Sequence, residues 1–543
     1  MTRHILGPSI AAIALTAIAP TTLAAPVGEE VNYPALEARL GGSVPDGTNV
    51  VVGQVESNEN NIPGRYSVAP TDGQFVNLGI TFIEMSGPAT FSDHARNVAY
   101  RMYGETLSIT PDIPTVHIWE TVNWLTSGYL NVGTANDPLV APGGIKIFNN
   151  SWAAATSVDN DILRRLDGVV ARDDVLMING VPNAGQNGLP LPSWSYNGIA
   201  VGLANGNHIS VDTSGAVDGS GRMKPELVVD GSLTSFVTPI VSACCALLID
   251  AVREVPGNPT LANAERSEVI KAILLAGATR NASWTNNPAT SGTMRGVTAR
   301  PLDNVFGAGV PDIDQSHLMI FAGEQDASTA FPSEANVSNI GWDLATMGLG
   351  ETYLYRFDVP ATASEASFAA TWHRRLSSGF TIPNTTDINL ELARFNDSGG
   401  LDFLVGDNGL GVFESGNVVS ESAVDNIELL HLRNLIAGDY LLFVSRGSGG
   451  SGEPWDVALA WTMDIEIPVV LCPQDCAPDN GDGTYGNGVV NIDDLIAVIN
   501  SFDELGGPCD GAPDNGDGTF GNNIVNIDDL IAVINEFGPC PTP

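Results

Sequence analysis

Basic residues are scarce in this chain of 543 residues. It contains 23 Lys and Arg against 63 Asp and Glu, which gives a formal net charge of −40. Such a surface repels phosphates, so the composition argues against a nucleic-acid partner. It favours solubility and divalent cations instead. The imbalance is strongest from Cys472 onward, where 13 residues are Asp or Glu and none is Lys or Arg.

Long hydrophobic runs are scarce beyond the N-terminus. Residues 1–24 combine Arg3 and His4 with an apolar stretch and small residues before Ala24, which is the pattern of a cleaved secretory signal. No later run is expected to span a membrane. The chain is therefore predicted to be exported and soluble, either secreted or held at the cell surface.

Cysteine is also rare, with six residues in two groups. Cys244 and Cys245 are neighbours inside an apolar run, so they are expected to be small core residues. The other four lie in the acidic tail of an exported chain, which predicts two disulfides. The connectivity stays open among Cys472, Cys476, Cys509 and Cys540.

A chain of this length exceeds one core, and about three domains are expected. After a short N-terminal segment over 25–47, residues 48–324 alternate apolar β-rich runs with helical stretches. This alternation predicts an α/β domain whose parallel sheet has helices on both faces, with its site at the carboxyl ends of the strands. We expect strands over 49–55, 145–148, 175–179, 199–203 and 227–229, and helices over 94–103, 161–171, 238–252 and 265–277.

The helical pattern fades after this domain. Residues 326–468 contain alternating, half-buried runs separated by turn residues, which predicts a β-sandwich. We expect strands over 352–359, 367–372, 389–393, 440–445 and 455–461.

A serine at the start of a buried helix is the first candidate for chemistry. Ser235 follows Leu233 and Thr234 and precedes the apolar run 240–252. The unpaired N–H groups of a helix N-terminus favour negative charge, which suits a nucleophile in acyl transfer. Taken alone, Thr and Ser in this place are also ordinary helix caps.

Three other polar residues occur in an order that supports the catalytic interpretation. Glu56 follows the first predicted strand, His94 opens a helix and Asn183 follows the strand 175–179. The order acid, histidine, serine on a parallel α/β scaffold is one of those known for catalytic triads. Each residue alone has a simpler explanation: a solvated charge for Glu56, an exposed helix start for His94 and a turn for Asn183.

Over about 48–322 the chain resembles the subtilisin-like serine peptidases, or subtilases. The similarity rests on short motifs that occur in the family's order. They are His94-Ala95-Arg96-Asn97-Val98-Ala99, Asn150-Ser151-Trp152-Ala153, Asn183-Ala184-Gly185, Met223-Lys224-Pro225-Glu226, Thr234-Ser235-Phe236-Val237-Thr238-Pro239 and Phe306-Gly307-Ala308-Gly309.

The resemblance implies an endopeptidase that hydrolyses peptide bonds. Ser235 would be the nucleophile, His94 the general base and then acid, and Glu56 the group that orients the imidazole. The Asn183 side chain and the Ser235 N–H would stabilise the oxyanion. The substrate backbone would pair as an added strand with the segment Asn150, Ser151, Trp152 and Ala153.

Three positions depart from the family's pattern. Subtilases have Asp where this chain has Glu56, and glycine where it has Ala95 and Leu233. The longer acid requires the strand or the ring to shift by about 1–1.5 Å to keep its hydrogen bond. The alternative from another class is a catalytically inactive subtilase-fold protein that binds a surface or scaffold.

The tail contains an internal repeat. Residues 477–500 return almost unchanged as 512–535, at an offset of 35 residues. Each copy carries oxygen side chains on a glycine-rich loop before an apolar helix, and calcium needs about six to eight oxygens. The helices, over 495–502 and 530–537, are expected to bury one apolar face each by pairing. The candidate ligands are Asp479, Asp482, Asn487, Asn491, Asp494, Asp514, Asp517, Asn522, Asn526 and Asp529.

These repeats are similar to the dockerin type of EF-hand, in Val490-Asn491-Ile492-Asp493-Asp494-Leu495 and its copy at 525–530. The resemblance implies a small helical module over 472–540 that holds Ca²⁺, with no organic cofactor. It also implies a cohesin-like or cell-surface partner besides the protein or peptide substrate. The alternative is a metal-free pair of caps held by disulfides.

Overall fold

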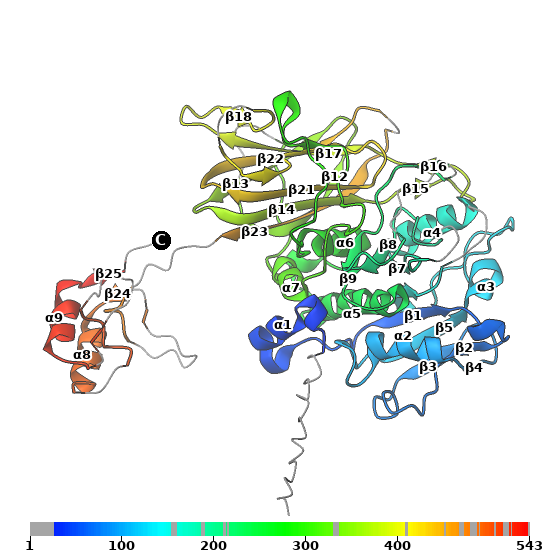
Figure 1. Cartoon of the computed structure of the whole chain (residues 1–543), viewed down its shortest axis with the longest axis horizontal. Helices are drawn as coiled ribbons and strands as arrows, with labels where there is room; N and C mark the ends of the chain where they lie inside the picture. The colour runs from blue at the N-terminus through cyan, green and yellow to red at the C-terminus, as the bar shows by residue number, and fades with distance from the viewer. Residues whose placement is uncertain are drawn as a thin grey trace, which may run out of the picture. The chain divides into compact units, whose positions relative to one another are not determined.

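The chain forms two compact units, Met1–Asp464 and Ile465–Pro543 (Figure 1). The predicted signal over 1–24 lies outside the described residues. The computed structural model describes residues 27–153, 160–185, 191–209, 213, 215, 217–329, 336–407, 411–449, 452–465, 472–477, 486–487, 489–503, 507–513, 521–522 and 524–540.

An all-parallel sheet of seven strands forms the centre of the first unit. The strand order β3-β5-β1-β6-β7-β8-β9 places β1 between β5 and β6. The prediction of an α/β fold with a parallel sheet is confirmed. The strands are β1 (Val51–Glu56), β3 (Thr81–Glu84), β5 (Thr115–Glu120), β6 (Ile145–Asn150), β7 (Leu176–Gly180), β8 (Ile199–Leu203) and β9 (Leu227–Val229).

Strands β3 and β5 are missing from the sequence-based prediction. Strand β5 contains His117 and ends in Glu120, while β3 is mostly exposed at the edge of the sheet. Such short mixed runs have no period that separates them from loops. The first predicted strand also ends too early, because Glu56 is itself the last residue of β1.

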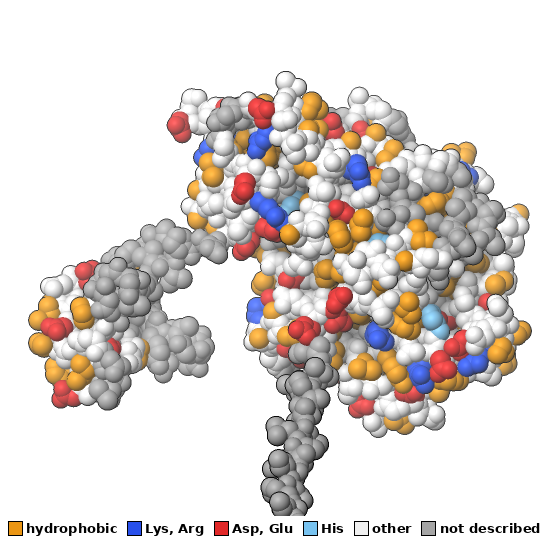
Figure 2. All heavy atoms as spheres, viewed as in Figure 1, with side chains coloured by type: hydrophobic (Ala, Val, Ile, Leu, Met, Phe, Trp, Pro, Cys, Tyr) orange, Lys and Arg blue, Asp and Glu red, His pale blue; other side chains and the backbone are white. Residues whose placement is uncertain are grey.

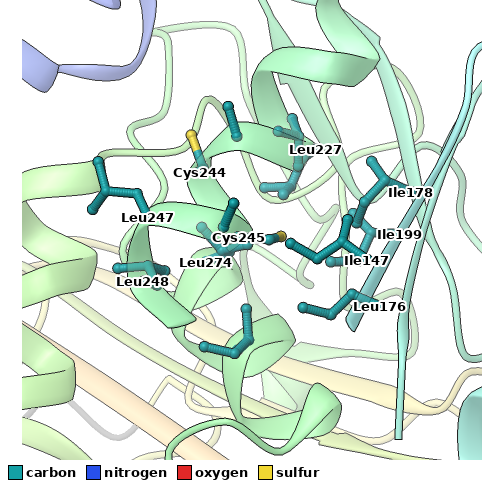
Figure 3. Close-up of a cluster of buried hydrophobic side chains, with 14 of the residues drawn as sticks. Ile147, Leu176, Ile178, Ile199, Leu227, Cys244, Cys245, Leu247, Leu248 and Leu274 are labelled. Carbon is teal, nitrogen blue, oxygen red and sulfur yellow. The ribbon is translucent and has the colours of Figure 1, made fainter. Parts of the chain in front are cut away.

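Helices cover both faces of the sheet, as predicted. Helices α2 (Asp93–Tyr103), α5 (Thr234–Arg253) and α6 (Ser267–Ala276) share one core with the sheet, and α4 (Asn160–Asp173) packs on the opposite face. Figure 3 shows Ile147, Ile178 and Ile199 of the strands facing Cys245 of α5. Both Cys244 and Cys245 are buried and unpaired, as expected of core residues.

Helix α5 begins four residues before the predicted start at 238 and therefore includes Ser235. Pro239 lies inside this helix. Because Pro239 has no N–H, the Ser235 carbonyl lacks its usual helical donor. Contrary to expectation, α5 is long and apolar enough to cross a membrane; 89% of that apolar window is buried, as in a core helix.

The buried carboxylate of Asp250 ties the start of β1 to α5. It accepts hydrogen bonds from the backbone N–H groups of Gly47 and Asn49, at 2.8 and 2.9 Å, and from the Asn49 side chain at 2.9 Å. Several donors are needed to offset the cost of burying this charge. The helix that carries Ser235 thus also holds the strand that ends at Glu56.

A β-sandwich follows the α/β part within the same compact unit. One sheet has the order β10-β20-β17-β22-β13-β11, with β18 beside β17, and the other has the order β12-β23-β14-β21-β19. The strands are β10 (Val297–Thr298), β11 (Asn336–Val337), β12 (Ile340–Met347), β13 (Thr352–Val359), β14 (Ala363–Trp372), β17 (Ile388–Phe395), β18 (Leu401–Phe403), β19 (Ser415–Gly416), β20 (Val419–Ser420), β21 (Ile427–Leu435), β22 (Gly438–Arg446) and β23 (Trp455–Ile465).

The sandwich is joined to the α/β part by buried contacts. Thr371 of β14 donates a hydrogen bond to the carbonyl of Glu268 on α6 at 2.7 Å. The indole N–H of Trp342 donates to the carbonyl of Ile320 on α7 (Ile313–Phe321) at 3.0 Å. Strand β10 also comes from the α/β region and pairs with β20. The two parts therefore share one framework.

The segment before β1 packs on the outside of this framework. Helix α1 (Tyr33–Leu40) contacts α7, with an ion pair of 2.6 Å between Arg39 and Asp314. Asn32 donates to Asp312 at 2.8 Å. Other short elements of the unit include β2 (Arg65–Ser67), β4 (Thr90–Phe91), α3 (Thr121–Asn123), β15 (Arg375–Leu376) and β16 (Pro383–Asn384).

The second unit pairs one short helix from each repeat. Helices α8 (Ile492–Asn500) and α9 (Ile527–Asn535) are accompanied by a two-stranded pairing of β24 (Val489–Val490) with β25 (Gly538–Pro539). The two predicted disulfides are present, and their connectivity is Cys472–Cys540 and Cys476–Cys509.

The tail helices have a second apolar row, so the prediction of one buried face each was incomplete. Val498 and Val533 lie in the core between the helices. The outer row stays exposed after pairing, and Figure 2 shows hydrophobic side chains gathered on this unit. That row consists of Ile492, Ile496, Ile499, Phe502, Ile527, Ile531, Ile534 and Phe537, with exposed fractions between 41% and 56%.

Candidate active site

The carboxyl ends of three neighbouring strands bring the predicted site residues together. Glu56 ends β1, Asn150 ends β6, and Asn183 follows the end of β7. The first turns of α2 and α5 supply His94 and Ser235. A cavity of about 310 Å³ lies there, lined by Ser57, Asn58, Glu59, Asn60, His94, Ser151, Trp152, Ala153, Gly180, Val181, Asn183, Thr234 and Ser235.

Glu56 lies fully buried behind His94. Its Oε2 is 2.7 Å from Nδ1 of the imidazole, and the Glu56 side chain has no exposed surface. His94 stands in the first turn of α2 because Ser92 caps this helix, accepting a hydrogen bond from the backbone N–H of Ala95 at 3.1 Å. A glutamate therefore reaches the imidazole from this strand without losing the hydrogen bond.

The carboxylate also changes the basicity of the ring. Burial lowers the pKa of His94, but the charge of Glu56 and its hydrogen bond raise it more, with a smaller contribution from Glu59. The pKa of His94 therefore lies above the ordinary value of 6.5. The neutral ring, which alone can accept a proton, predominates only above this raised pKa.

Ser235 lines the same cavity, at the N-terminus of α5. Its Oγ donates a hydrogen bond to the carbonyl of Ser151 at 3.2 Å. Within the described part of the chain, no hydrogen bond joins Ser235 to His94. Catalytic hydrogen bonds are often incomplete before substrate binds. The Ser235 hydroxyl has one proton, so it would have to leave the Ser151 carbonyl in order to donate to the imidazole.

The side chain of Asn183 is oriented by the start of α5. Its Oδ1 accepts a hydrogen bond from the backbone N–H of Thr234 at 2.9 Å. The loop that carries it is fixed by a bridge between Asn183 and His208. The amide of Asn183 therefore lies at the same helix N-terminus as Ser235, where developing negative charge is favoured.

The segment predicted to bind substrate has two parts. Ser151, Trp152 and Ala153 line the cavity. The buried side chain of Asn150 lies outside this lining, where it donates to Asn179 at 3.0 Å and accepts from the Trp152 indole at 3.0 Å. The Asn150 side chain thus holds the segment in place through contacts in the protein interior.

Several lining residues are absent from the sequence-based prediction. Ser57, Asn58, Glu59 and Asn60 belong to the loop after β1. Their position directly after a strand that ends in a catalytic candidate is a signal that could have identified them.

Two of the residues that differ from the subtilase pattern lie in different surroundings. Ala95 is fully buried beneath the site, whereas Leu233 is 41% exposed at the N-cap of α5. Neither side chain lines the cavity.

No protein-family model and no curated protein matches this chain. The chain is similar to solved structures of subtilisin-like serine proteases. The patellamide maturation protease PatA has 18% identity and a TM-score of 0.34, over 52% of this chain and 99% of that one. The prenylagaramide maturation protease PagA has 19% identity and a TM-score of 0.35, over 52% and 98%.

A serine protease of Aeromonas sobria covers more of the chain. It has 12% identity and a TM-score of 0.31, over 77% of this chain and 88% of that one. These likenesses concern the fold alone.

The predicted calcium ligands lie only partly within the described residues. Asp479, Asp482, Asp514 and Asp517 fall outside them. Asn487, Asn491 and Asp494 are described, as are Asn522, Asn526 and Asp529.

In the described part, both repeats use their helix-start residues in the same way. Buried Asp494 accepts from the N–H groups of Cys476 and Asn491, each at 2.8 Å. Asp529 accepts from Ala512 and Asn526, each at 2.8 Å. These carboxylates therefore complete the capping boxes at the starts of α8 and α9 and also hold the segments at Cys476 and Ala512.

A further carboxylate of the tail is absent from the predicted ligand set. Asp475 accepts from the N–H of Asn487 at 3.0 Å and lies beside Cys472 and Cys540. The two sulfur atoms are joined in a disulfide, so they are not metal ligands.

Proposed function

We propose that this protein is a serine endopeptidase that hydrolyses peptide bonds through Glu56, His94 and Ser235. The hydrogen bond of 2.7 Å between the buried Glu56 and His94 carries this proposal. His94 shares its cavity with a serine at a helix N-terminus, which is the setting of an activated hydroxyl nucleophile.

The reaction begins with the attack of Ser235 Oγ on the scissile carbonyl carbon. The hydroxyl proton moves to Nε2 of His94, while Glu56 accepts the Nδ1 hydrogen bond and stabilises the imidazolium. The C–N bond then breaks, and His94 gives its proton to the leaving amine. Water repeats the sequence on the acyl-enzyme, releasing the acid and restoring the serine.

The tetrahedral oxyanion needs donors that are already in place. The backbone N–H of Ser235 and the side-chain amide of Asn183 supply them at the start of α5. One such side-chain donor contributes roughly 10²–10³ in rate. The acyl part of the substrate extends along Ser151, Trp152 and Ala153 as an added strand.

A non-catalytic binding protein is the second candidate. The hydrogen bond from Ser235 to the Ser151 carbonyl favours it, because a hydroxyl that donates its one proton there does not donate it to the imidazole. Reactivity of the serine separates the two functions.

A fluorophosphonate probe tests the enzymatic proposal directly. We expect it to label the full chain at Ser235, as located by mass spectrometry of the peptides, because only an activated serine displaces fluoride at an appreciable rate. The Ser57→Ala variant is the matched control, since Ser57 lines the same cavity and should leave labelling unchanged. Folded protein that stays unlabelled would favour the binding protein.

The disulfides of the tail are typical of proteins from an oxidising compartment. Together with the signal-like N-terminus, they support a secreted or cell-surface location. The repeats support a role for the tail as a calcium-binding module that attaches the enzyme to a cohesin-like or other surface partner. The exposed apolar rows of α8 and α9 provide a surface for this partner.

Calcium should stabilise the tail. We expect excess Ca²⁺ to raise the melting transition of the tail in the full chain by several degrees relative to excess chelator, because the ion binds only the folded loops. The Asp479→Ala, Asp514→Ala double variant should lose most of this shift. The Asp493→Ala, Asp528→Ala double variant removes one exposed carboxylate from each repeat and should keep the shift. Identical scans with calcium and with chelator would contradict the metal assignment.

A further inference from the structure

The Glu56 carboxylate is held on two sides, and only one side is the imidazole. While Oε2 contacts His94, Oε1 accepts a hydrogen bond from Nε2 of Gln54 at 2.8 Å. Gln54 lies two residues earlier in β1, so both side chains point to the face covered by α2. Neither has any exposed surface. Gln54 is therefore a buried residue that directly contacts the Glu56 carboxylate.

The orientation of the Gln54 amide is determined by a group that can only accept. Its Nε2 also donates to the carbonyl of Ala95 on α2, at 2.9 Å. Since a carbonyl has no proton to give, this atom must be the nitrogen. The oxygen end of the amide then receives the hydroxyl of Tyr103, at 2.5 Å. Every hydrogen-bonding atom of the Gln54 side chain is thus engaged.

Tyr103 completes the chain of contacts from the far end of α2. Its side chain is fully buried, and burial together with the charge of Glu56 raises the pKa of Tyr103 well above its usual value. The hydroxyl therefore stays protonated and donates a hydrogen bond to Gln54. The order of donation is Tyr103 to Gln54 to Glu56, with Glu56 also accepting from His94.

We propose that Gln54 and Tyr103 are positioning residues that make a glutamate effective as the triad acid. A glutamate has one more rotatable bond than an aspartate, so its carboxylate can turn away from the ring more easily. The Gln54 amide holds Oε1 and thereby directs Oε2 at Nδ1 of His94. This inference rests on the proposed peptidase function for its catalytic consequence, but the geometry of the pair can be measured without turnover.

The test compares three variants of the full chain. Gln54→Met removes the donor to Glu56 at similar side-chain length, and Tyr103→Phe removes one oxygen atom. Tyr100→Phe is the matched control, because it removes a hydroxyl from the same helix that bonds instead to Asp72 at 2.9 Å.

The first measurement is the NMR titration of His94 and the resonance of its Nδ1 proton. With Gln54→Met we expect a lower titration midpoint and a broadened proton resonance, because Glu56 spends less time on the ring. In Tyr103→Phe, the titration midpoint should also fall and the proton resonance should also broaden, but both changes should be smaller than in Gln54→Met. Glu59 also raises the pKa of His94, and its contribution is unchanged in all three variants.

The second measurement is steady-state hydrolysis. We expect kcat to fall about 10–100-fold in Gln54→Met with KM nearly unchanged, since a small misplacement of a catalytic group acts on the chemical step. Tyr103→Phe should lose several-fold and Tyr100→Phe should match the wild type.

The proposal is overturned if folded Gln54→Met and Tyr103→Phe behave like Tyr100→Phe in both measurements, because the pair would then only fill the core. If Gln54→Met does not fold, the single-atom change in Tyr103→Phe decides. If the wild type hydrolyses nothing, the peptidase proposal fails, whereas the His94 titration still decides whether Gln54 positions Glu56.

Discussion

Replacing Ser235 by alanine should lower kcat for peptide hydrolysis by about 10⁶-fold, because it removes the hydroxyl that is proposed to form the acyl-enzyme. KM should change little, since the Oγ contributes to bond formation more than to substrate binding. The measurement is kcat and KM on a peptide that the wild type cleaves. The remaining rate should be roughly 10³–10⁴ times that of the uncatalysed reaction in water, owing to the oxyanion donors and to substrate binding.

Ser232→Ala is the matched control for this result. Ser232 is an exposed serine of the loop before α5, and its loss should leave kcat within about twofold, as for surface changes away from the chemistry. A Ser235→Ala enzyme with substantial activity would mean that another nucleophile acts, and the assigned triad would be wrong.

Glu56→Gln should reduce kcat by roughly 10⁴-fold, while the protein keeps its fold. The substituted side chain has nearly the same shape but presents an amide. Its NH₂ end would donate to Nδ1 of His94, which forces the proton to Nε2. A ring with its proton on Nε2 cannot accept the proton of Ser235. The loss thus comes from the wrong tautomer, with the geometry kept.

The same substitution should move the remaining activity to lower pH. In the wild type, the charge and hydrogen bond of Glu56 outweigh burial and raise the pKa of His94. Without the charge, burial dominates and the pKa falls below the ordinary value. The acid limb of the kcat/KM profile should therefore shift downward, and the measurement is kcat/KM across the range in which histidine titrates. A profile that moves upward would contradict the assignment.

The pH dependence of the free energy of unfolding should also change in Glu56→Gln. A raised pKa in the folded state means that protonated His94 stabilises the fold below the unfolded pKa, and this stabilisation is lost as pH rises through the folded pKa. Glu56→Gln removes it. The measurement is the free energy of unfolding across the pH range in which histidine titrates. Glu59→Gln should change this pH dependence less than Glu56→Gln, because Glu59 makes the smaller contribution to the His94 pKa. Its ion pair with Arg65, at 2.9 Å, does not depend on the titration of histidine.

The parts of the fold that could be predicted are those with strong periodic signals. Strands β8 and β9 have the predicted bounds, since both are continuous apolar runs between turns. Strand β13 also matches, because it alternates. Strand β5 could not be predicted, since a histidine and a terminal glutamate interrupt its pattern. Such polar positions are decided by neighbours distant in sequence.

The candidate site follows the same rule. The positions of Glu56, His94 and Ser235 follow from strand ends and helix starts, which are local features of the chain. Gln54 could not be found in this way, because a single glutamine inside an apolar strand does not indicate which side chains it contacts. Its partners on α2 become apparent only in the folded structure. The disulfide connectivity depends on the folded tail as well, since several pairings fit the same spacing.

The anchoring of β1 by Asp250 has a consequence for how the proposed activity would be lost. Asp250 lies 15 residues beyond Ser235 on one continuous helix, or about 22 Å along its axis. The helix that carries Ser235 is thereby fixed, near its far end, to the segment before the strand that ends at Glu56. Loss of these hydrogen bonds on heating would let Ser235 and Glu56 move relative to each other, so the proposed activity should be lost together with local opening at residues 46–49.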